Sequence, residues 1–399
     1  MNALVAHYHE LGLKGRNREF FEKALIRNVR RALRGAGYKR IRGGFGRVMV
    51  DFFDVPEPEL QAAAEQVARI FGVAYVGLGT RVTPDMEEIA TIALQMMTEA
   101  PFDSFRVRAR RTYSTFEQSS NAINVEVGQR IKDATGGRVD LKNADATAWI
   151  ELFGNTGIVY RTRLTGPGGL PVGVSGKMIA MISGGIDSPV AAWLMAKRGA
   201  EVELVHFHGQ PFTDPSSVRQ VSELAEVLTR YQLRTVLHLV PIGDAQRAIV
   251  THAPAPLRMV LYRRLMLRIA GELASRQEAD AVITGDSLGQ VASQTIQNIR
   301  TIDDAEPGIQ MLRPLIGFDK QEIVDRAMKI GTYEISTRNY QDCCVLFAPR
   351  SPATRTRPSD AATAEQDLDV SELVGKALAA VETRVIELPP PEAGSQLES

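Results

Sequence analysis

Six residues between an apolar stretch and a helical stretch constrain the fold of this chain most strongly: Ser183-Gly184-Gly185-Ile186-Asp187-Ser188. Met178–Ile182 before them is apolar, as in a buried strand, and Pro189–Arg198 after them has helical spacing. Ser188 is expected as the N-cap and Pro189 as the first helical residue, since both residue types are favoured there. A strand, a glycine loop and a helix in this order are typical of a parallel α/β sheet.

The loop has the composition of an anion-binding site. Two adjacent glycines allow backbone N–H groups to turn inward, and the helix N-terminus adds partial positive charge. The hydroxyls of Ser183 and Ser188 can donate to phosphate oxygens, and Asp187 indicates a Mg²⁺ bridge, since bare phosphate would repel it. The sequence contains neither a Walker A loop nor a dinucleotide fingerprint. A glycine-rich turn without a ligand is the alternative interpretation of the glycines alone.

After residue 172 strands and helices alternate, which predicts a parallel sheet covered by helices on both faces. The further strands are expected at Val202–Phe207, Thr235–Pro241 and Ala281–Thr284, and the further helices at Val218–Tyr231 and Leu257–Leu273. Asp319 and Glu322 have capping-box spacing, so a helix is expected from there to Ile330.

The first 165 residues predict two α+β modules. In the first, strands at Leu4–His9 and Phe45–Phe52 and helices at Arg18–Leu33 and Pro58–Ile70 indicate a ferredoxin-like arrangement. The second is expected to contain helices Met86–Glu99 and Ile123–Ala134, strand Phe105–Ala109, and a hairpin of Trp149–Phe153 with Ile158–Arg163. The expected domains are therefore 1–58, 59–165 and 174–352, followed by an acidic tail, 353–399, that is partly disordered.

Charge and cysteine content narrow the function. Residues 1–50 hold twelve Lys or Arg against three acids, which indicates a polyanion partner, although a solvated helix face is the alternative. The two cysteines, Cys343 and Cys344, are adjacent, which excludes disulfide scaffolding and structural zinc and leaves a thiol for chemistry. No apolar run is long enough to span a bilayer and no leader is apparent, so a cytoplasmic protein without membrane contact is expected.

Several strings resemble known motifs. Ser183–Ser188 resembles the SGGxDS signature of PP-loop ATP pyrophosphatases, and residues from about 60 to 165 resemble a THUMP domain, a tRNA-binding module. Further strings, in the same order, resemble motifs of tRNA 4-thiouridine synthetases: Glu10–Arg18, Arg263–Met266, Gly285–Thr295 and Asp342-Cys343-Cys344. The resemblance implies a ferredoxin-like module, a THUMP domain and a doubly wound PP-loop domain, and it predicts no rhodanese domain.

The same resemblance implies an enzyme that splits ATP to AMP and pyrophosphate while adenylating a tRNA uridine, at position 8, and then replaces its 4-carbonyl oxygen with persulfide sulfur. The implied catalytic residues are Asp187, Lys320 and Cys344, with Cys343 as the alternative persulfide carrier. The implied nucleotide site consists of Met181, Ile182, Ser183, Gly184, Gly185, Asp187, Ser188, His206, Phe207, Arg263, Gly285 and Gln294. No dedicated protein metal site is expected.

The implied cofactors are ATP and Mg²⁺, and the implied partners are tRNA and a cysteine desulfurase as sulfur donor. A sulfur-carrier protein of thiamine thiazole synthesis is a further option, and so is a homodimer. Two other functions compete: a PP-loop ligase acting on a small molecule, and a tRNA-binding protein with a degenerate ATP site. The basic N-terminal module argues against the first, and the intact loop with its paired cysteines against the second.

Overall fold

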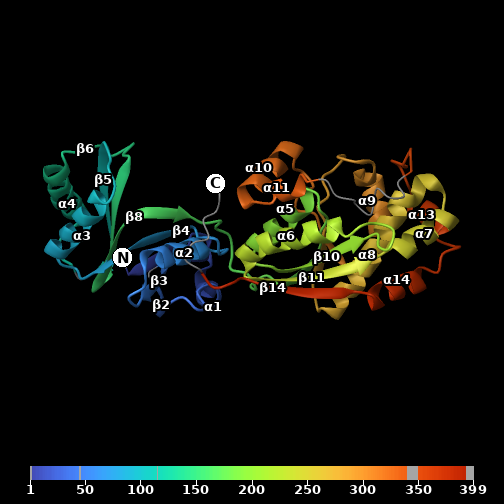
Figure 1. Ribbon diagram of the computed structural model, residues 1–399, viewed down its shortest axis with the longest axis horizontal. Coiled ribbons are helices and arrows are strands. Elements are labelled where there is room, and N and C mark those ends of the chain that lie inside the picture. The colour runs from blue at the N-terminus through green and yellow to red at the C-terminus, as the bar shows by residue number, and fades with distance from the viewer. Residues whose placement is uncertain (1, 45, 115, 339–348, 392–399) are drawn as a thin grey trace. The chain divides into compact units, whose positions relative to one another are not determined.

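The computed structural model describes residues 2–44, 46–114, 116–338 and 349–391 (Figure 1). The chain forms two compact units, one of Met1–Pro171 together with the C-terminal residues from Pro389, and one of Val172–Leu388. Within the described ranges no helix is long and apolar enough to cross a membrane.

The N-terminal unit is built on a mixed sheet of eight strands in the order β2-β3-β1-β4-β8-β7-β5-β6. The strands are β1 (Ala3–His7), β2 (Tyr38–Gly44), β3 (Arg47–Phe52), β4 (Tyr75–Val82), β5 (Ser104–Ser114), β6 (Arg138–Val139), β7 (Ala146–Gly154) and β8 (Thr156–Thr165). The α-helices are α1 (Arg18–Ala32), α2 (Glu57–Ala68), α3 (Met86–Thr98) and α4 (Ser120–Thr135). The four expected helices and the expected hairpin are confirmed.

The first six of these elements follow the order β1-α1-β2-β3-α2-β4, the split βαβ arrangement of a ferredoxin-like fold. β1 lies between β3 and β4 and pairs antiparallel with both. Two strands complete the module beyond the expected elements. Gly43 and Gly44 do not break the chain but lie in β2, and β4 follows α2. The expected boundary at residue 58 therefore falls inside this module, within α2.

The other half of the unit consists of β5 to β8 with α3 and α4. β5 pairs parallel with β7, and β7 pairs antiparallel with β8. Alternate residues of these strands bury one face against the two helices, because successive strand residues point to opposite faces. The strand members of this core are Val82, Phe105, Val107, Ala146, Ala148, Ile150, Leu152 and Val159, and the helix members include Ile89, Ala93, Met97, Ile123, Val127 and Ile131.

The second unit contains a six-stranded sheet in the order β13-β12-β9-β10-β11-β14. The strands are β9 (Lys177–Met181), β10 (Glu201–His208), β11 (Arg234–Pro241), β12 (Ala281–Ile283), β13 (Gln310–Leu312) and β14 (Glu382–Glu387). The helices are α5 (Asp187–Lys197), α6 (Ser216–Gln232), α7 (Gly243–His252), α8 (Arg258–Arg276), α9 (Ile296–Asp303), α10 (Lys320–Ile330), α11 (Tyr333–Ser336), α13 (Pro358–Ala364) and α14 (Val370–Ala379). The strands from β9 to β13 pair in parallel, which confirms the doubly wound α/β prediction.

This strand order defines where a ligand can bind. From β9 the chain adds β10 and β11 on one side and then crosses over to place β12 on the other. In open α/β sheets such a reversal leaves a crevice outside the carboxyl ends of the two neighbouring strands. The loops after β9 and β12 meet at this crevice, and Ser183–Ser188 begins the first of them.

The acidic tail up to Leu388 is part of the second unit, which corrects the expectation that the α/β domain ends at 352. Helix α14 ends at Ala379, and β14 then pairs antiparallel with β11. Glu365, after α13, accepts hydrogen bonds from Arg264 and Arg268 of α8, the latter at 2.8 Å. The negative charge in this region therefore stabilises the fold. The residues of the tail beyond 391 lie outside the described part.

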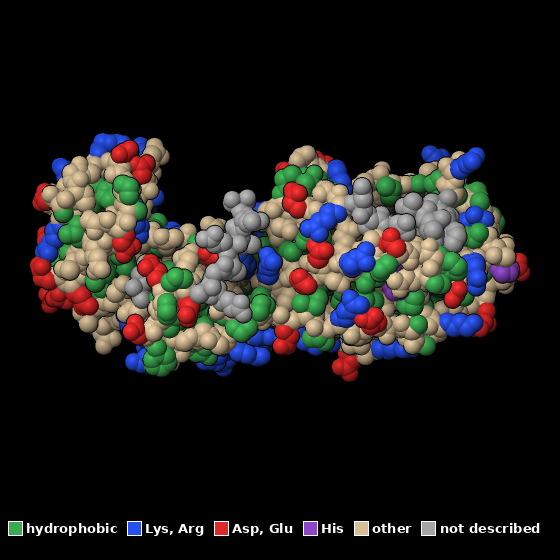
Figure 2. Space-filling view, in the orientation of Figure 1, with side chains coloured by type: hydrophobic (Ala, Val, Ile, Leu, Met, Phe, Trp, Pro, Cys, Tyr) green, Lys and Arg blue, Asp and Glu red, His purple; other side chains and the backbone are tan. Residues whose placement is uncertain are grey.

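Basic and acidic side chains both occur across the visible surface (Figure 2). On the face in Figure 2, blue and red side chains alternate over most of the molecule, and several basic ones lie along the lower edge near α1 and β2. The charge asymmetry of the sequence is therefore visible as a local feature of the N-terminal unit.

Candidate functional site

The glycine loop is held closed by its two serines. The Ser183 N–H donates to the Ser188 hydroxyl at 2.9 Å, and the Gly185 N–H points to the Ser183 hydroxyl at 3.3 Å. Ser188 is thus not the N-cap that its position predicted. α5 begins at Asp187, the N-cap position is Ile186, and no side chain caps the first turn. The hydroxyl that was expected to cap the helix shapes the loop, and the N-terminus of the helix stays open to an anion.

Gly285 lets the loop after β12 approach the glycine loop closely. A Cβ atom at this position would lie 2.8 Å from both the backbone N and the Cα of Ser188. Any side chain would therefore push the two loops apart. Close packing of the two loops at the crevice therefore requires glycine at position 285.

Asp187 and Lys320, far apart in the sequence, form an ion pair across the crevice. The Lys320 Nζ lies 2.5 Å from Asp187 Oδ1, and the amide of Gln290 donates to Asp187 Oδ2 at 2.8 Å. Lys320 is the first residue of α10, whose start is set by the expected capping box of Asp319 and Glu322. The prediction of this capping box is confirmed, and the capped helix places the lysine next to the glycine loop.

A buried carboxylate, Asp286, organises the opposite side of the site. Its oxygens accept from the guanidinium of Arg263 at 2.5 Å, from Arg313 at 3.2 Å and from the hydroxyl of Thr284 at 2.7 Å. Gln294 also donates to it, at 3.2 Å. Burial alone would raise the pKa of Asp286, but the two guanidinium groups and these hydrogen bonds hold it below its usual range.

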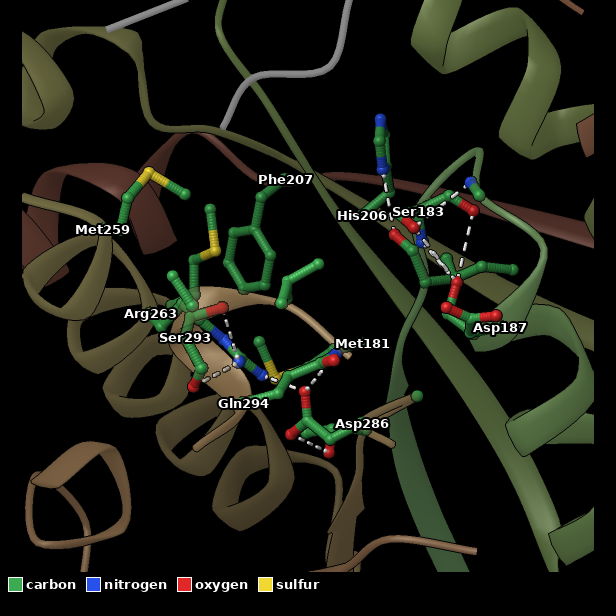
Figure 3. A pocket seen from close by; sticks show the side chains of 18 of the residues that line it. Met181, Ser183, Asp187, His206, Phe207, Met259, Arg263, Asp286, Ser293 and Gln294 are labelled. Atoms are coloured by element: carbon green, nitrogen blue, oxygen red, sulfur yellow. Dashed lines mark hydrogen bonds and ion pairs between the residues drawn. The ribbon is translucent and has the colours of Figure 1, made fainter. Parts of the chain in front are cut away.

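Asp286 was not among the predicted site residues, although it follows Gly285 directly. The string Gly285–Thr295 was the available signal, but it could not show which of its members turn inward. In the structure Asp286 is 3% exposed and fixes the positions of both Arg263 and Gln294. It therefore acts through its neighbours and keeps the arginine aligned with the cavity (Figure 3).

We expect Asp286→Asn to destabilise the second unit by about 3 kcal/mol, because two partly buried guanidinium groups lose their shared counter-charge. Urea denaturation followed by tryptophan fluorescence measures this, in a Trp149→Phe background that leaves Trp193 as the remaining reporter. The matched control is Asp304→Asn, whose half-exposed carboxylate pairs with Arg264 at 3.4 Å and should contribute about 1 kcal/mol or less. Equal effects of the two substitutions would contradict the proposed role of the buried cluster.

His206 is buried and contacts the backbone just before the glycine loop. Its ring nitrogens lie 3.0 Å from the carbonyl oxygen of Ile182 and 3.2 Å from the hydroxyl of Ser217. The side chain also contributes to the cavity wall. His206 is therefore both a buried core histidine and part of the cavity wall.

These elements enclose a cavity of about 580 Å³, a size typical of nucleotide and other small-molecule sites. Eleven of the twelve predicted nucleotide-site residues line it. The exception is Gly184, whose carbonyl oxygen faces Gln220 at 3.3 Å. Additional lining residues are Met259, Met266, Thr284, Asp286, Val291, Ala292, Ser293, Pro349 and Pro352. Figure 3 shows Met181, Phe207 and Met259 on the apolar side and Asp187 near Ser183 at the loop.

The lining has two chemically distinct halves. The helix N-terminus is positively polarised, with Lys320 paired to Asp187 beside it, whereas the methionines and Phe207 form an apolar slot. At the slot, the buried Oε1 of Gln294 has no hydrogen-bond partner among the described residues. A buried amide oxygen without a partner can accept from the amino group of a base. These observations fit a nucleotide with its phosphates at the loop.

The persulfide candidates Cys343 and Cys344 lie outside the described residues. Chain on both sides of them is described: Arg338 forms an ion pair with Glu223 at 2.6 Å, and Pro349 lines the cavity. Within the described ranges, no group of three or more His, Cys, Asp or Glu side chains is placed to hold a metal ion.

Comparison with known proteins assigns the chain to a family. Three family models match it: the ThiI ferredoxin-like domain over residues 3–77, the THUMP domain over 83–161, and thiamine biosynthesis protein (ThiI) over 173–370. A probable tRNA sulfurtransferase from Moorella thermoacetica is 40% identical over 98% of both chains. The chain belongs to the ThiI family of tRNA sulfurtransferases. A further family member, from Thermus thermophilus, is 42% identical over 94% of this chain and 91% of its own.

Solved structures agree with the ThiI assignment. A crystal structure of a 4-thiouridine synthetase–RNA complex with bound ATP matches with a TM-score of 0.87, at 35% identity, over 97% of this chain and 100% of that one. PH1313 from Pyrococcus horikoshii matches with a TM-score of 0.63 at 27% identity, over 83% of this chain and 100% of that one. The predicted family and the predicted ferredoxin-like, THUMP and PP-loop fold are therefore confirmed.

Proposed function

We propose that this ThiI family member is an ATP-dependent tRNA sulfurtransferase that converts a tRNA uridine, at position 8, to 4-thiouridine. One observation carries the proposal: the glycine loop, the Asp187–Lys320 pair and an apolar slot converge on one cavity at the switch point of the sheet. The related 4-thiouridine synthetase was crystallised with ATP and RNA, which supports ATP and tRNA as ligands here.

We propose that ATP binds with its phosphates at the start of α5 and its adenine in the apolar slot. The first-turn N–H groups of α5 and the glycines would hold the phosphates, and Gln294 would accept from the adenine amino group. Asp187 would hold Mg²⁺, which would supply positive charge at the phosphates, and Mg²⁺ in such sites needs few protein ligands. Lys320 would then neutralise the charge that accumulates on the phosphates.

The proposed reaction proceeds in two displacements. The uridine 4-oxygen attacks the α-phosphorus, and pyrophosphate leaves with the electrons of the broken P–O bond. This step turns a poor leaving group into a good one, since the oxygen becomes part of AMP. Lys320 and the helix N-terminus are placed to stabilise the negative charge of the departing pyrophosphate. Sulfur then adds to carbon 4, and AMP departs with the original oxygen.

We propose that the sulfur arrives as a persulfide on Cys344, because a thiolate is nucleophilic and readily accepts sulfur from a donor. A cysteine desulfurase would load it, with Cys343 as the secondary thiol. After the outer sulfur has bonded to carbon 4, a small-molecule thiol would attack the Cys344 sulfur, so that the S–S bond breaks and its electrons stay on the 4-thiouridine sulfur. Cys344 is then left in a mixed disulfide, which a second thiol reduces. By the same family resemblance the enzyme would work in the cytoplasm, as a monomer or homodimer. It would also supply sulfur to a carrier protein of thiamine thiazole synthesis.

The test is a reconstitution with the full chain, Mg²⁺, ATP, unmodified tRNA and a persulfide-generating desulfurase, followed by nucleoside analysis. We expect 4-thiouridine to form only when all components are present, with one AMP released per modified base. Consumption of ATP without tRNA, coupled to a small acceptor, would instead identify a small-molecule PP-loop ligase.

A further inference from the structure

One face of the eight-stranded sheet in the N-terminal unit is not covered by α3 and α4. In β7, Ile150 and Leu152 pack in the core with these helices, so the alternating Trp149 and Glu151 point to the other face. A separate apolar cluster on that face consists only of strand residues, Ala3, Val5, Met49, Phe153, Ile158 and Tyr160, with Trp149 packed against it. We call this side the open face of the sheet.

On the open face an arginine is clamped between two aromatic rings. The guanidinium carbon of Arg163 lies 3.5 Å from the ring centroid of Tyr75 and 4.4 Å from that of Trp149. His7 stacks on Tyr75, with ring centroids 4.4 Å apart and an angle of 18° between the planes. Arg163 is nevertheless exposed to solvent. Two rings thus restrict its rotamers while its charged group stays accessible.

A buried network fixes the rings beneath the clamp. Glu151 accepts from His7 at 2.8 Å, from Arg47 at 2.6 Å and from the hydroxyl of Tyr160 at 2.7 Å. Tyr160 in turn stacks on Trp149. Burial alone would raise the pKa of Glu151, but hydrogen bonds and the charges of His7 and Arg47 lower it to about 2. The carboxylate of Glu151 therefore remains charged, and its oxygens accept hydrogen bonds from these three partners.

Because Glu151 is occupied by buried partners, it does not neutralise the positive charge of the arginines at the surface of the open face. In β5, Val107 packs in the core with α3 and α4. Arg108 and Arg110 stand at the alternate positions of this strand, so they point to the open face, where both are exposed. Arg108, Arg110 and Arg163 have no ion-pair partner among the described residues. Arg106, by contrast, donates to Thr147 and to two backbone carbonyls. Three accessible guanidinium groups beside two aromatic rings thus form an anion site with stacking surfaces.

We propose that this clamp binds the RNA substrate, with the fork of Arg163 on a backbone phosphate and Arg108 and Arg110 on neighbouring phosphates. This inference rests on the proposed function for the identity of the RNA. A planar fork matches a phosphate bidentately, and contacts to phosphates position a nucleic acid without reading its sequence. Arg163 is on this view a positioning residue: it sets how tRNA lies on the N-terminal unit and takes no part in the chemistry.

The test uses the full chain and unmodified tRNA, with the dissociation constant measured from 50 to 200 mM salt. We expect Arg163→Met to weaken binding about tenfold at low salt, the effect of losing one charge-assisted contact. The slope of log affinity against log salt should fall by about one phosphate contact. Arg163→Lys keeps the charge without the fork, so it should retain the slope and lose part of the affinity.

The matched control is Lys132→Met, which removes one positive charge from α4, on the covered side of the sheet, where Lys132 is exposed. Unchanged affinity in Arg163→Met would overturn the proposal and leave the clamp as a stabiliser of the sheet. Equal losses in both variants would also overturn it, because they would indicate a diffuse basic field.

Tryptophan fluorescence distinguishes RNA from a free anion. We expect tRNA to change the emission of Trp149, a change that Trp149→Phe should lack, whereas inorganic phosphate at the same phosphate concentration should have no effect. An equal response to inorganic phosphate would overturn RNA as the ligand. In the sulfur-transfer assay, Arg163→Met should raise the KM for tRNA and leave kcat near that of the wild type. Binding is measured without turnover, so a failure of the proposed reaction would not be mistaken for a failure of the clamp.

Discussion

Asp187→Ala is expected to lower tRNA-dependent pyrophosphate release by at least about a hundredfold, the scale of losing one electrostatic contact in an active site. The substitution removes the partner of Lys320 at 2.5 Å and of Gln290 at 2.8 Å, and with it the proposed Mg²⁺ ligand. The affinity for tRNA should remain near that of the wild type, because the proposed RNA contacts lie in the other unit.

The matched control for this prediction is Asp244→Ala. Asp244 also lies in the first turn of a helix of the same unit, but its side chain is 74% exposed and pairs with Arg247 at 3.3 Å. It should keep full activity. Lys320→Ala should resemble Asp187→Ala, and Gln290→Ala should cost less than either. Pyrophosphate release at the wild-type rate in Asp187→Ala would refute the assignment of the loop.

Cys344→Ser is expected to abolish 4-thiouridine formation while tRNA-dependent ATP cleavage continues. The reason is the order of the proposed steps, since adenylation of the uridine precedes the attack of sulfur. Cys344 precedes Pro349, a residue of the cavity wall, by five residues, so at most about 18 Å of extended chain separates the two. This chain length is compatible with the proposed role of Cys344.

Cys343→Ser provides the matched control, because it removes the same group one residue away. It should retain part of the activity under multiple turnover, measured as 4-thiouridine per tRNA. A vicinal disulfide requires a strained ring, which makes Cys343 a poor resolving thiol for its neighbour. Full turnover by Cys344→Ser would exclude the proposed sulfur route and leave Cys343 or free sulfide as the carrier.

Most helices and strands were predictable because their signals are local. The helical spacing of Arg18–Leu33, the hairpin glycine at 154 and the capping box at Asp319 each depend on residues a few positions apart, and all three are confirmed. Predictions failed where a residue type that is typical of one local structure serves another in the fold. No strand was expected just before Phe45, but Gly43 and Gly44 lie in an edge strand, where glycine is tolerated at a cost in stability. Ser188 was taken as a cap, but its hydroxyl binds the loop.

The sequence by itself determined the family, the order of the domains and the chemical character of the phosphate loop, because these reside in contiguous strings such as Ser183–Ser188. Only the tertiary structure decided which distant side chains meet there. Lys320 lies 133 residues from Asp187, and Asp286 faces inward because of the strand order β12-β9-β10 and the close approach at Gly285. The clamp on Arg163 likewise depends on the register of β4, β7 and β8. Sheet order and register result from packing over the whole domain, so no local pattern encodes them.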